Sequence, residues 1–320
     1  MTLKQILNKT NVIVKKQGIV IAFLVVTVFF SVTTKSFFTY RNIALILRQV
    51  SILGIIACGM TFVIIAGNWD LSVGSLTSLT TVLVISLHDK IGPIPAIIFV
   101  LIAGLLFGIF SGYLVGFLKL NSIIVTLGMM SIIQAITLIY TGGKYTRIVA
   151  PEETWFGFIG RGFVLRIPFP VILYAIFIVI FSIILNKTVF GRQVRAVGGN
   201  YVASLFSGIR ANKVVMITFI MTGITSAIGG IILGSRMMAA QNYIGSGYEL
   251  QVITGVILGG TSLAGGEGKI EKTFLGILII GVLNNGLIMI GFPYYIQWVI
   301  QGLIIIGVVW MDATTKRGEV

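Results

Sequence analysis

The sequence predicts an all-α integral membrane protein in which about ten transmembrane helices form one bundle. Three observations lead to this fold class. Of the 320 residues, 57% are hydrophobic and only 10% are charged, a balance that soluble domains do not show. The apolar stretches, such as residues 19–32 and 172–185, are continuous and do not alternate as barrel strands would. Backbone amides also need partners in lipid, so continuous apolar stretches predict helices.

The elements follow from these apolar stretches in chain order. The first stretch comes after four lysines and has no small-residue cleavage site with a polar sequence behind it, so we interpret it as a retained helix. One transmembrane domain is expected over residues 1–320. The expected spans are residues 18–35, 43–66, 71–87, 94–118, 122–141, 168–186, 214–235, 248–266, 273–292 and 294–311.

A weak internal similarity indicates two five-helix halves. The apolar run at residues 62–67 resembles the run at 256–260, and a polar, serine-containing break follows each of them. The runs are short, and chance similarity remains the alternative.

The distribution of basic residues predicts the orientation. The net charge is +14, but the lysines and arginines lie in the connections between spans and not on one basic face, which argues against nucleic acid as a partner. More of them fall on the side of the amino terminus, so both termini are expected in the cytoplasm. Two connections are too long for simple turns: residues 142–167, expected outside, and residues 187–213, expected inside. Each is either a surface for a partner or a solvated loop.

The sharpest local feature is the polar break between the second and third spans. Asn68, Trp69, Asp70 and Ser72 interrupt apolar sequence here, and such a break is costly in a membrane unless it is solvated or used. We regard these four residues as candidates for the translocation pathway of a solute. The alternative is local: Asp70 caps the third span, and its neighbours permit tight packing. The two roles are compatible.

Asn284 and Asn285 are the other pathway candidates, because they fall in the middle of the ninth span. Their amides could bond to solute hydroxyls, or they could join helices to one another.

Catalysis and nucleotide binding find no support in the sequence. A glycine-rich stretch ends in Gly268 and Lys269, but a phosphate-binding loop would then have Leu263 at its first glycine and Ile270 at its Ser or Thr. One histidine, one cysteine and nine scattered carboxylates offer no metal-ligand spacing. We therefore expect neither an enzyme nor a bound cofactor or metal in this chain.

Eight short motifs together resemble the ribose-type sugar permeases of bacterial ABC importers. They occur in order along the chain: residues 70–75 (DLSVGS), 126–129 (TLGM), 140–143 (YTGG), 190–192 (FGR), 198–200 (GGN), 247–250 (GYEL), 259–263 (GGTSL) and 281–286 (GVLNNG). Each is weak alone, but the ordered set is specific. Members of this family usually have Gly-Gly-Ile before the aspartate, whereas this chain has Gly67, Asn68 and Trp69, which leaves the sugar open.

The resemblance implies a homodimeric permease in the bacterial inner membrane, about ten helices per subunit and two partners. One is a cytoplasmic ATP-binding subunit, which would handle ATP and Mg, and the other is an extracytoplasmic sugar-binding protein. It also implies that the 187–213 connection carries a short coupling helix that contacts the ATPase. The coupling candidates are Gly191, Arg192, Gly198, Gly199, Asn200 and Ala203.

Two rival functions remain at this stage. A stand-alone transporter driven by an ion gradient commonly places a charge within the bundle, but here Arg48, Asp70 and Glu249 all lie near expected span ends. A channel is disfavoured because no selectivity sequence stands out.

Overall fold

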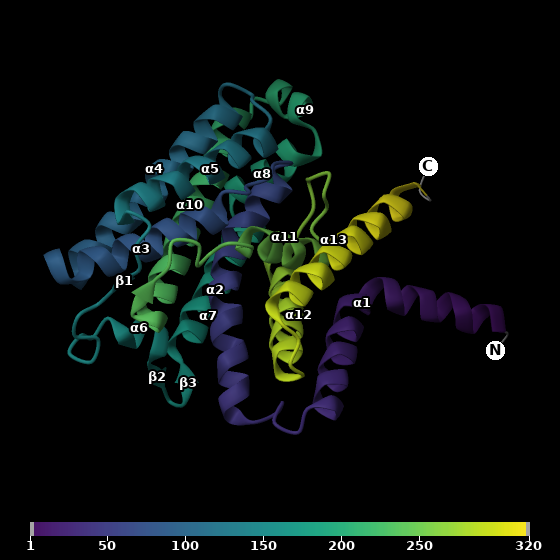
Figure 1. Ribbon diagram of the computed structural model, residues 1–320. Coiled ribbons are helices and arrows are strands. Elements are labelled where there is room, and N and C mark those ends of the chain that lie inside the picture. The colour runs from purple at the N-terminus through teal and green to yellow at the C-terminus, as the bar shows by residue number, and fades with distance from the viewer. Residues whose placement is uncertain (1–2, 318–320) are drawn as a thin grey trace.

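The computed structural model describes residues 3–317, with no description of the side chains of residues 3–17, 294, 308–309 and 311–317. Residues 1–2 and 318–320, on which the prediction of cytoplasmic termini falls, lie outside the described residues, as do the side chains of the basic residues near both ends. Helices dominate the described chain, which confirms the predicted class of helical membrane protein (Figure 1). Six of its helices are long and apolar enough to cross a membrane.

Three helices form the centre of the bundle: α2 (Tyr40–Ile65), α3 (Val73–Ile91) and α10 (Ala211–Met237). α10 packs against both of the others. α3 is rich in hydroxyls yet buried, because its threonines bond to carbonyls one turn back; Thr77 donates to the Val73 carbonyl at 2.7 Å and Thr81 to the Thr77 carbonyl at 2.7 Å. Bonding within the helix is what allows these polar residues to lie in the core.

Glycines bring α4 (Pro93–Gly116) against α10. A Cβ at Gly104 would lie 2.6 Å from the Gly223 carbonyl oxygen, and one at Gly108 would lie 2.7 Å from that of Phe219. Such spacing of small residues brings helix backbones together inside a membrane. The other faces of α4, α5 (Ser122–Thr141) and α7 (Phe169–Lys187) expose large apolar side chains, as lipid requires.

The carboxyl-terminal part adds three helices, one of them short. α11 (Tyr248–Leu258) packs on α12 (Ile270–Met289), which also contacts α1 (Leu3–Thr33), and α13 (Tyr294–Arg317) contacts both α11 and α12. α11 has 11 residues, or about 16 Å of helix, roughly half of a bilayer core.

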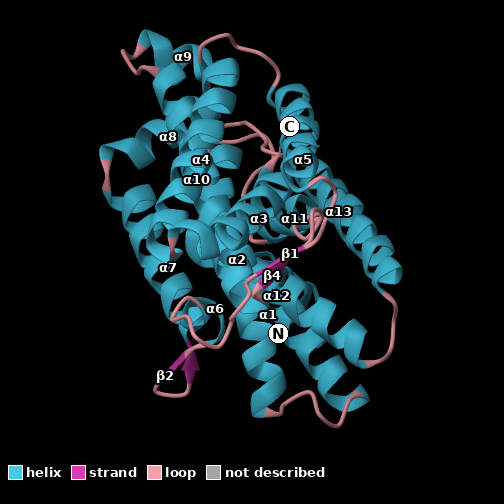
Figure 2. Cartoon of the chain, turned by 60° about the vertical axis from the view of Figure 1, so that its left-hand side comes forward, coloured by secondary structure: helices cyan, strands magenta, loops and turns pink. Residues whose placement is uncertain are grey.

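Short elements occupy the two ends of the bundle. α8 (Val189–Gly199) and α9 (Tyr201–Phe206) lie at one end, and α6 (Gly157–Arg161), β2 (Phe163–Val164) and β3 (Ile167–Pro168) lie at the other (Figures 1 and 2). β2 and β3 form an antiparallel hairpin. β1 (Thr146–Arg147) pairs antiparallel with β4 (Ala239–Ala240), with Thr146 opposite Ala240. The connections predicted to lie inside and outside are thus at opposite ends.

The helices differ most from the expectations in three places. The first begins at Leu3, well before residue 18. The span expected at 248–266 is helical only to Leu258, because Gly260 turns into a left-handed conformation with a φ of +79°. The 187–213 connection contains two helices, α8 and α9, where the resemblance implied a single short one; Thr188 starts α8 by accepting a hydrogen bond from the Gly191 amide. The count of ten crossings and the repeat of two halves stay predictions.

Candidate functional site

The break between α2 and α3 docks against the start of α5. The Trp69 amide donates to Ser122 Oγ at 3.2 Å. Asp70 is buried, and its Oδ1 accepts hydrogen bonds from the Ser72 amide at 3.0 Å and from Ser72 Oγ at 2.6 Å. Ser72 itself occupies the position before α3. Asp70, which was expected to cap the third span, therefore lies two residues before the cap position and fixes the turn that leads into α3.

The same break meets α8 and the 259–269 connection, backbone against backbone. The Gly266 amide donates to the Ile65 carbonyl at 2.8 Å. A Cβ at Gly198 would lie 1.7 Å from that same carbonyl oxygen, and one at Gly265 would lie 3.0 Å from Gly67 Cα. Three segments far apart in sequence thus form one contact, which we call the glycine joint (residues 65–67, 198–199 and 265–266). The joint thus connects α8 both to the break between α2 and α3 and to the 259–269 connection.

A cavity of about 420 Å³ opens beside the glycine joint. Asn68, Lys119, Gly198 and Asn200 are among the residues that line it. Each of these segments was expected on the inner side, so the structure groups them as the predicted topology requires.

The coupling candidates divide into two groups. Gly191 is buried, and a Cβ there would lie 2.1 Å from the Leu185 carbonyl oxygen, so the site has no room for a larger residue. Gly198 faces the glycine joint. In contrast, Arg192, Gly199, Asn200 and Ala203 are exposed, and Asn200 Oδ1 starts α9 by accepting from the Ala203 amide at 2.9 Å.

Sequence reasoning missed the apolar side chains of α9. Phe206 is 89% exposed and Val202 is 60% exposed, at the end of the bundle that carries α8. The signal was present in the sequence as apolar residues within a polar, basic connection.

Asn284 and Asn285 point to different partners. Asn284 Nδ2 donates to Gln251 Oε1 at 3.1 Å, and its Oδ1 accepts from Gln301 Nε2 at 3.0 Å. Asn285 and Asn42 exchange a pair of hydrogen bonds at 2.9 and 3.0 Å. The two amides join α12 to α11, α13 and α2, and their place in a solute pathway stays a prediction.

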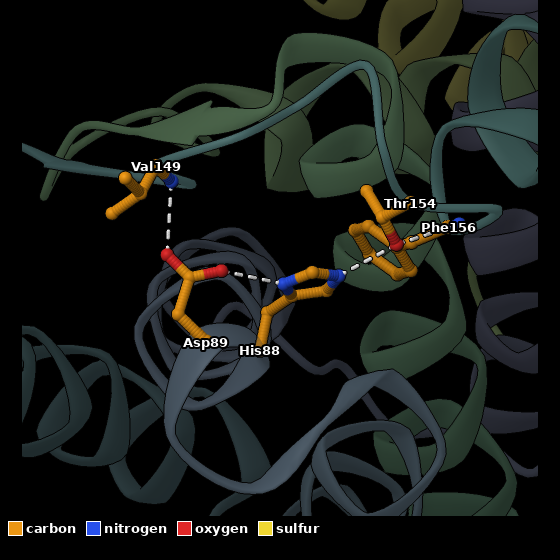
Figure 3. Close-up of polar contacts among 5 residues, drawn as sticks. All are labelled: His88, Asp89, Val149, Thr154 and Phe156. Carbon is orange, nitrogen blue, oxygen red and sulfur yellow. Dashed lines mark hydrogen bonds and ion pairs between the residues drawn. The ribbon is translucent and has the colours of Figure 1, made fainter.

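At the opposite end, His88 and Asp89 tie α3 to the 142–167 connection (Figure 3). His88 Nδ1 lies 2.8 Å from Asp89 Oδ1, and its Nε2 lies 2.8 Å from Thr154 Oγ1. Asp89 Oδ2 accepts from the Val149 amide at 2.9 Å. The His88 ring also lies 5.5 Å from that of Phe156, centre to centre. We call this group the outer clip (His88, Asp89, Val149, Thr154 and Phe156).

A second cavity, of about 190 Å³, lies between α3, α5 and α11. Its lining joins Ser75, Gln134 and Glu249 from three helices with residues of the 241–247 segment. Sequence reasoning did not single it out, although two of the eight motifs meet there: a Cβ at Gly74 would lie 2.0 Å from Glu249 Oε2.

The bundle, its polar breaks and its opposed end surfaces suit a membrane transport subunit. The family model described as branched-chain amino acid transport system / permease component matches residues 42–309. The chain therefore belongs to this family of membrane permeases.

Curated relatives narrow the family. The ribose import permease protein RbsC of Bacillus subtilis is 40% identical over 288 residues, which are 89% of this chain and 88% of that protein. RbsC of Haemophilus influenzae is 40% identical over 87% of this chain and 86% of its own length. The L-arabinose ABC transporter permease protein AraH of Azospirillum brasilense is 34% identical over 89% of this chain and 84% of its own. No solved structure gives a significant match.

Proposed function

We propose that this chain is the permease subunit of a bacterial ABC importer and forms the translocation pathway for a small sugar. The observation that carries the proposal is the length and level of its identity to ribose and arabinose import permeases. The description of the family model refers to branched-chain amino acid transport, whereas the relatives compared above are named for the import of ribose or arabinose. An ion-driven transporter, the rival function, has no counterpart among these relatives.

The α8–α9 end of the bundle supports a cytoplasmic ATPase as the energy source. α9 exposes Phe206 and Val202 beside the exposed Arg192 and Asn200, a mixture of apolar and polar groups that suits a protein partner. We infer that the partner binds ATP and Mg and that its closure pushes α8, which displaces both polar breaks through the glycine joint. This chain would itself hold no cofactor.

The opposite end suits an extracytoplasmic sugar-binding protein. The outer clip holds the 142–167 connection against α3, and the β2–β3 hairpin exposes Leu165. A fixed outer surface lets a loaded partner dock without first ordering a loop. Between the two ends, exposed apolar faces such as that of α4 contact the lipid bilayer, and a second copy of the chain completes the pathway. Both termini would then lie in the cytoplasm of a cell whose inner membrane holds the protein.

Stimulation of the partner ATPase tests this proposal. The chain, the proposed ATPase and the proposed sugar-binding protein are reconstituted in liposomes, and ATP hydrolysis is measured with and without sugar. We expect hydrolysis to rise when the loaded binding protein is present, and only in liposomes that contain this chain. An ATP hydrolysis rate that stays the same with and without this chain and the binding protein would refute the assignment.

A further inference from the structure

We propose that the cavity between α3, α5 and α11 is a weak subsite for the hydroxyls of the transported sugar. The inference rests on the proposed function, because it places the transported solute at a particular point of the pathway. We call this cavity the hydroxyl pocket. α3 contributes Ser75, α5 contributes Ser131 and Gln134, and α11 contributes Glu249. Met130, Tyr243 and Ser246 complete the lining.

Hydrogen bonds hold the walls of the hydroxyl pocket together, while several hydroxyl groups that line it take no part in them. Gln134 Nε2 donates to the Asn242 carbonyl at 2.8 Å, and the Gly245 amide donates to Ser78 Oγ at 2.9 Å. These bonds fix the 241–247 segment between α5 and α3. Within the described part of the chain, the hydroxyls of Ser75, Tyr243 and Ser246 have no hydrogen-bond partner.

Glu249 supplies a strong acceptor to the same space. Its side chain is only 8% exposed, and its Oε1 accepts from the Gly247 amide at 3.1 Å. The carboxylate reaches this position only because Gly74 has no Cβ, and a carboxylate buried in a membrane is costly unless it is used. Free hydroxyls and one carboxylate match a neutral solute that offers many hydroxyls, which both donate and accept.

The same lining disfavours an amino acid. None of the described residues that line the hydroxyl pocket is a lysine or arginine. Glu249 can pair with the ammonium group of an amino acid, but the carboxylate of the same solute would find no cation in this lining and would lie near the like charge of Glu249. The volume of about 190 Å³ admits a pentose or hexose.

The depth of the hydroxyl pocket also fits a pathway. Met130, Ser131 and Gln134 lie at the middle of α5 (Ser122–Thr141), and α11 is a half-length helix that begins beside the cavity. Transporters commonly place their solute sites near the midplane, where interrupted helices end.

Protection of a cysteine from labelling tests the subsite without the partner subunits. The native Cys58 is 1% exposed, so Ser131→Cys gives one accessible thiol. Ser31→Cys is the matched control, because Ser31 and Ser131 both donate to a carbonyl of their own helix, at 2.7 and 3.2 Å. We expect D-ribose or L-arabinose to slow alkylation of Ser131→Cys about twofold at the dissociation constant. Leucine and the Ser31→Cys control should show no such effect.

Each other outcome counts against the subsite. A Ser131→Cys thiol that is never labelled, is not protected by any sugar, or is protected equally by leucine would overturn it. Ser246→Cys, on another wall, repeats the test if Ser131→Cys does not fold, and adding Glu249→Gln should abolish protection. An importer that transports a pentose without protection of either cysteine refutes the subsite alone, whereas an importer that transports no sugar refutes the proposed function.

Discussion

At the residue scale, two adjacent glycines of α8 face opposite environments. Gly198 lies against the Ile65 carbonyl, where a Cβ would come within 1.7 Å of backbone, while a Cβ at Gly199 would meet nothing within 4 Å. The resemblance to sugar permeases implied that both positions contact the ATPase. It could not predict that one faces inward, because the contact joins segments more than 100 residues apart, a relation that local pattern does not encode.

Gly198→Ala should therefore uncouple or unfold the protein, whereas Gly199→Ala should not. Overpacking against backbone costs about 1–3 kcal/mol, and the three atoms nearest to a Cβ at Gly198 all belong to the backbone. We expect lower thermal stability and little uptake for Gly198→Ala, and values near wild type for Gly199→Ala. Equal stability and equal uptake in the two variants would show that close packing at Gly198 is not needed for coupling.

Substitution of Asn284 distinguishes a role in helix packing from a role in the solute pathway. Asn284→Ala would leave the buried amides of Gln251 and Gln301 without their partner, at a cost of about 1–3 kcal/mol. We expect a lower melting temperature with unchanged preference among sugars, and a much smaller loss for the exposed Asn186→Ala. A stable Asn284→Ala protein that prefers a different sugar would instead place Asn284 in the pathway.

At the scale of single elements, α9 is the helix that we propose contacts the ATPase. Phe206→Ala should lower uptake and ATPase stimulation at least about tenfold if the ring is an anchor in the partner, and should leave stability unchanged because the side chain is 89% exposed. Phe110→Ala removes the same side chain from the apolar face of α4, where it is 52% exposed, and serves as the control. Equal loss in both variants would argue against α9 as the contact.

The outer clip makes the 142–167 connection sensitive to acid. Burial acts to raise the pKa of Asp89, but hydrogen bonds from His88 and the Val149 amide, with the charge on His88, outweigh it and hold the pKa below its ordinary value of 3.8. A lowered carboxyl pKa stabilises the folded state above pH 3.8, and this stabilisation is lost as the pH falls through the lower value.

Limited proteolysis of the 142–167 connection between about pH 6 and pH 3 checks this behaviour. We expect cleavage to rise at the acidic end in the wild type. Asp89→Asn should already be more susceptible at pH 6 and respond less to acid, while Glu152→Gln in the same connection should behave as the wild type. A wild-type profile in Asp89→Asn would show that the clip does not hold the connection.

At the scale of the whole molecule, continuous apolar runs were enough to predict the membrane class and the bounds of several helices. The expected spans 94–118 and 122–141 differ by at most two residues from α4 (Pro93–Gly116) and α5 (Ser122–Thr141). The half-length of α11 was not predicted: the expected span runs to residue 266, and only the backbone shows that the glycines after Leu258 end the helix. The hydroxyl pocket was missed for a related reason: Ser75, Ser131 and Glu249 each look unremarkable locally and meet only in the fold.

Sugar uptake into proteoliposomes tests the central claim most directly. Liposomes that contain this chain are prepared with and without the ATPase, the binding protein and ATP on the cytoplasmic side, and labelled pentoses and hexoses are supplied outside. Uptake of a sugar that requires all three proteins and ATP is the predicted result. Uptake by this chain alone, driven by a proton or sodium gradient, would contradict the account and identify a secondary transporter.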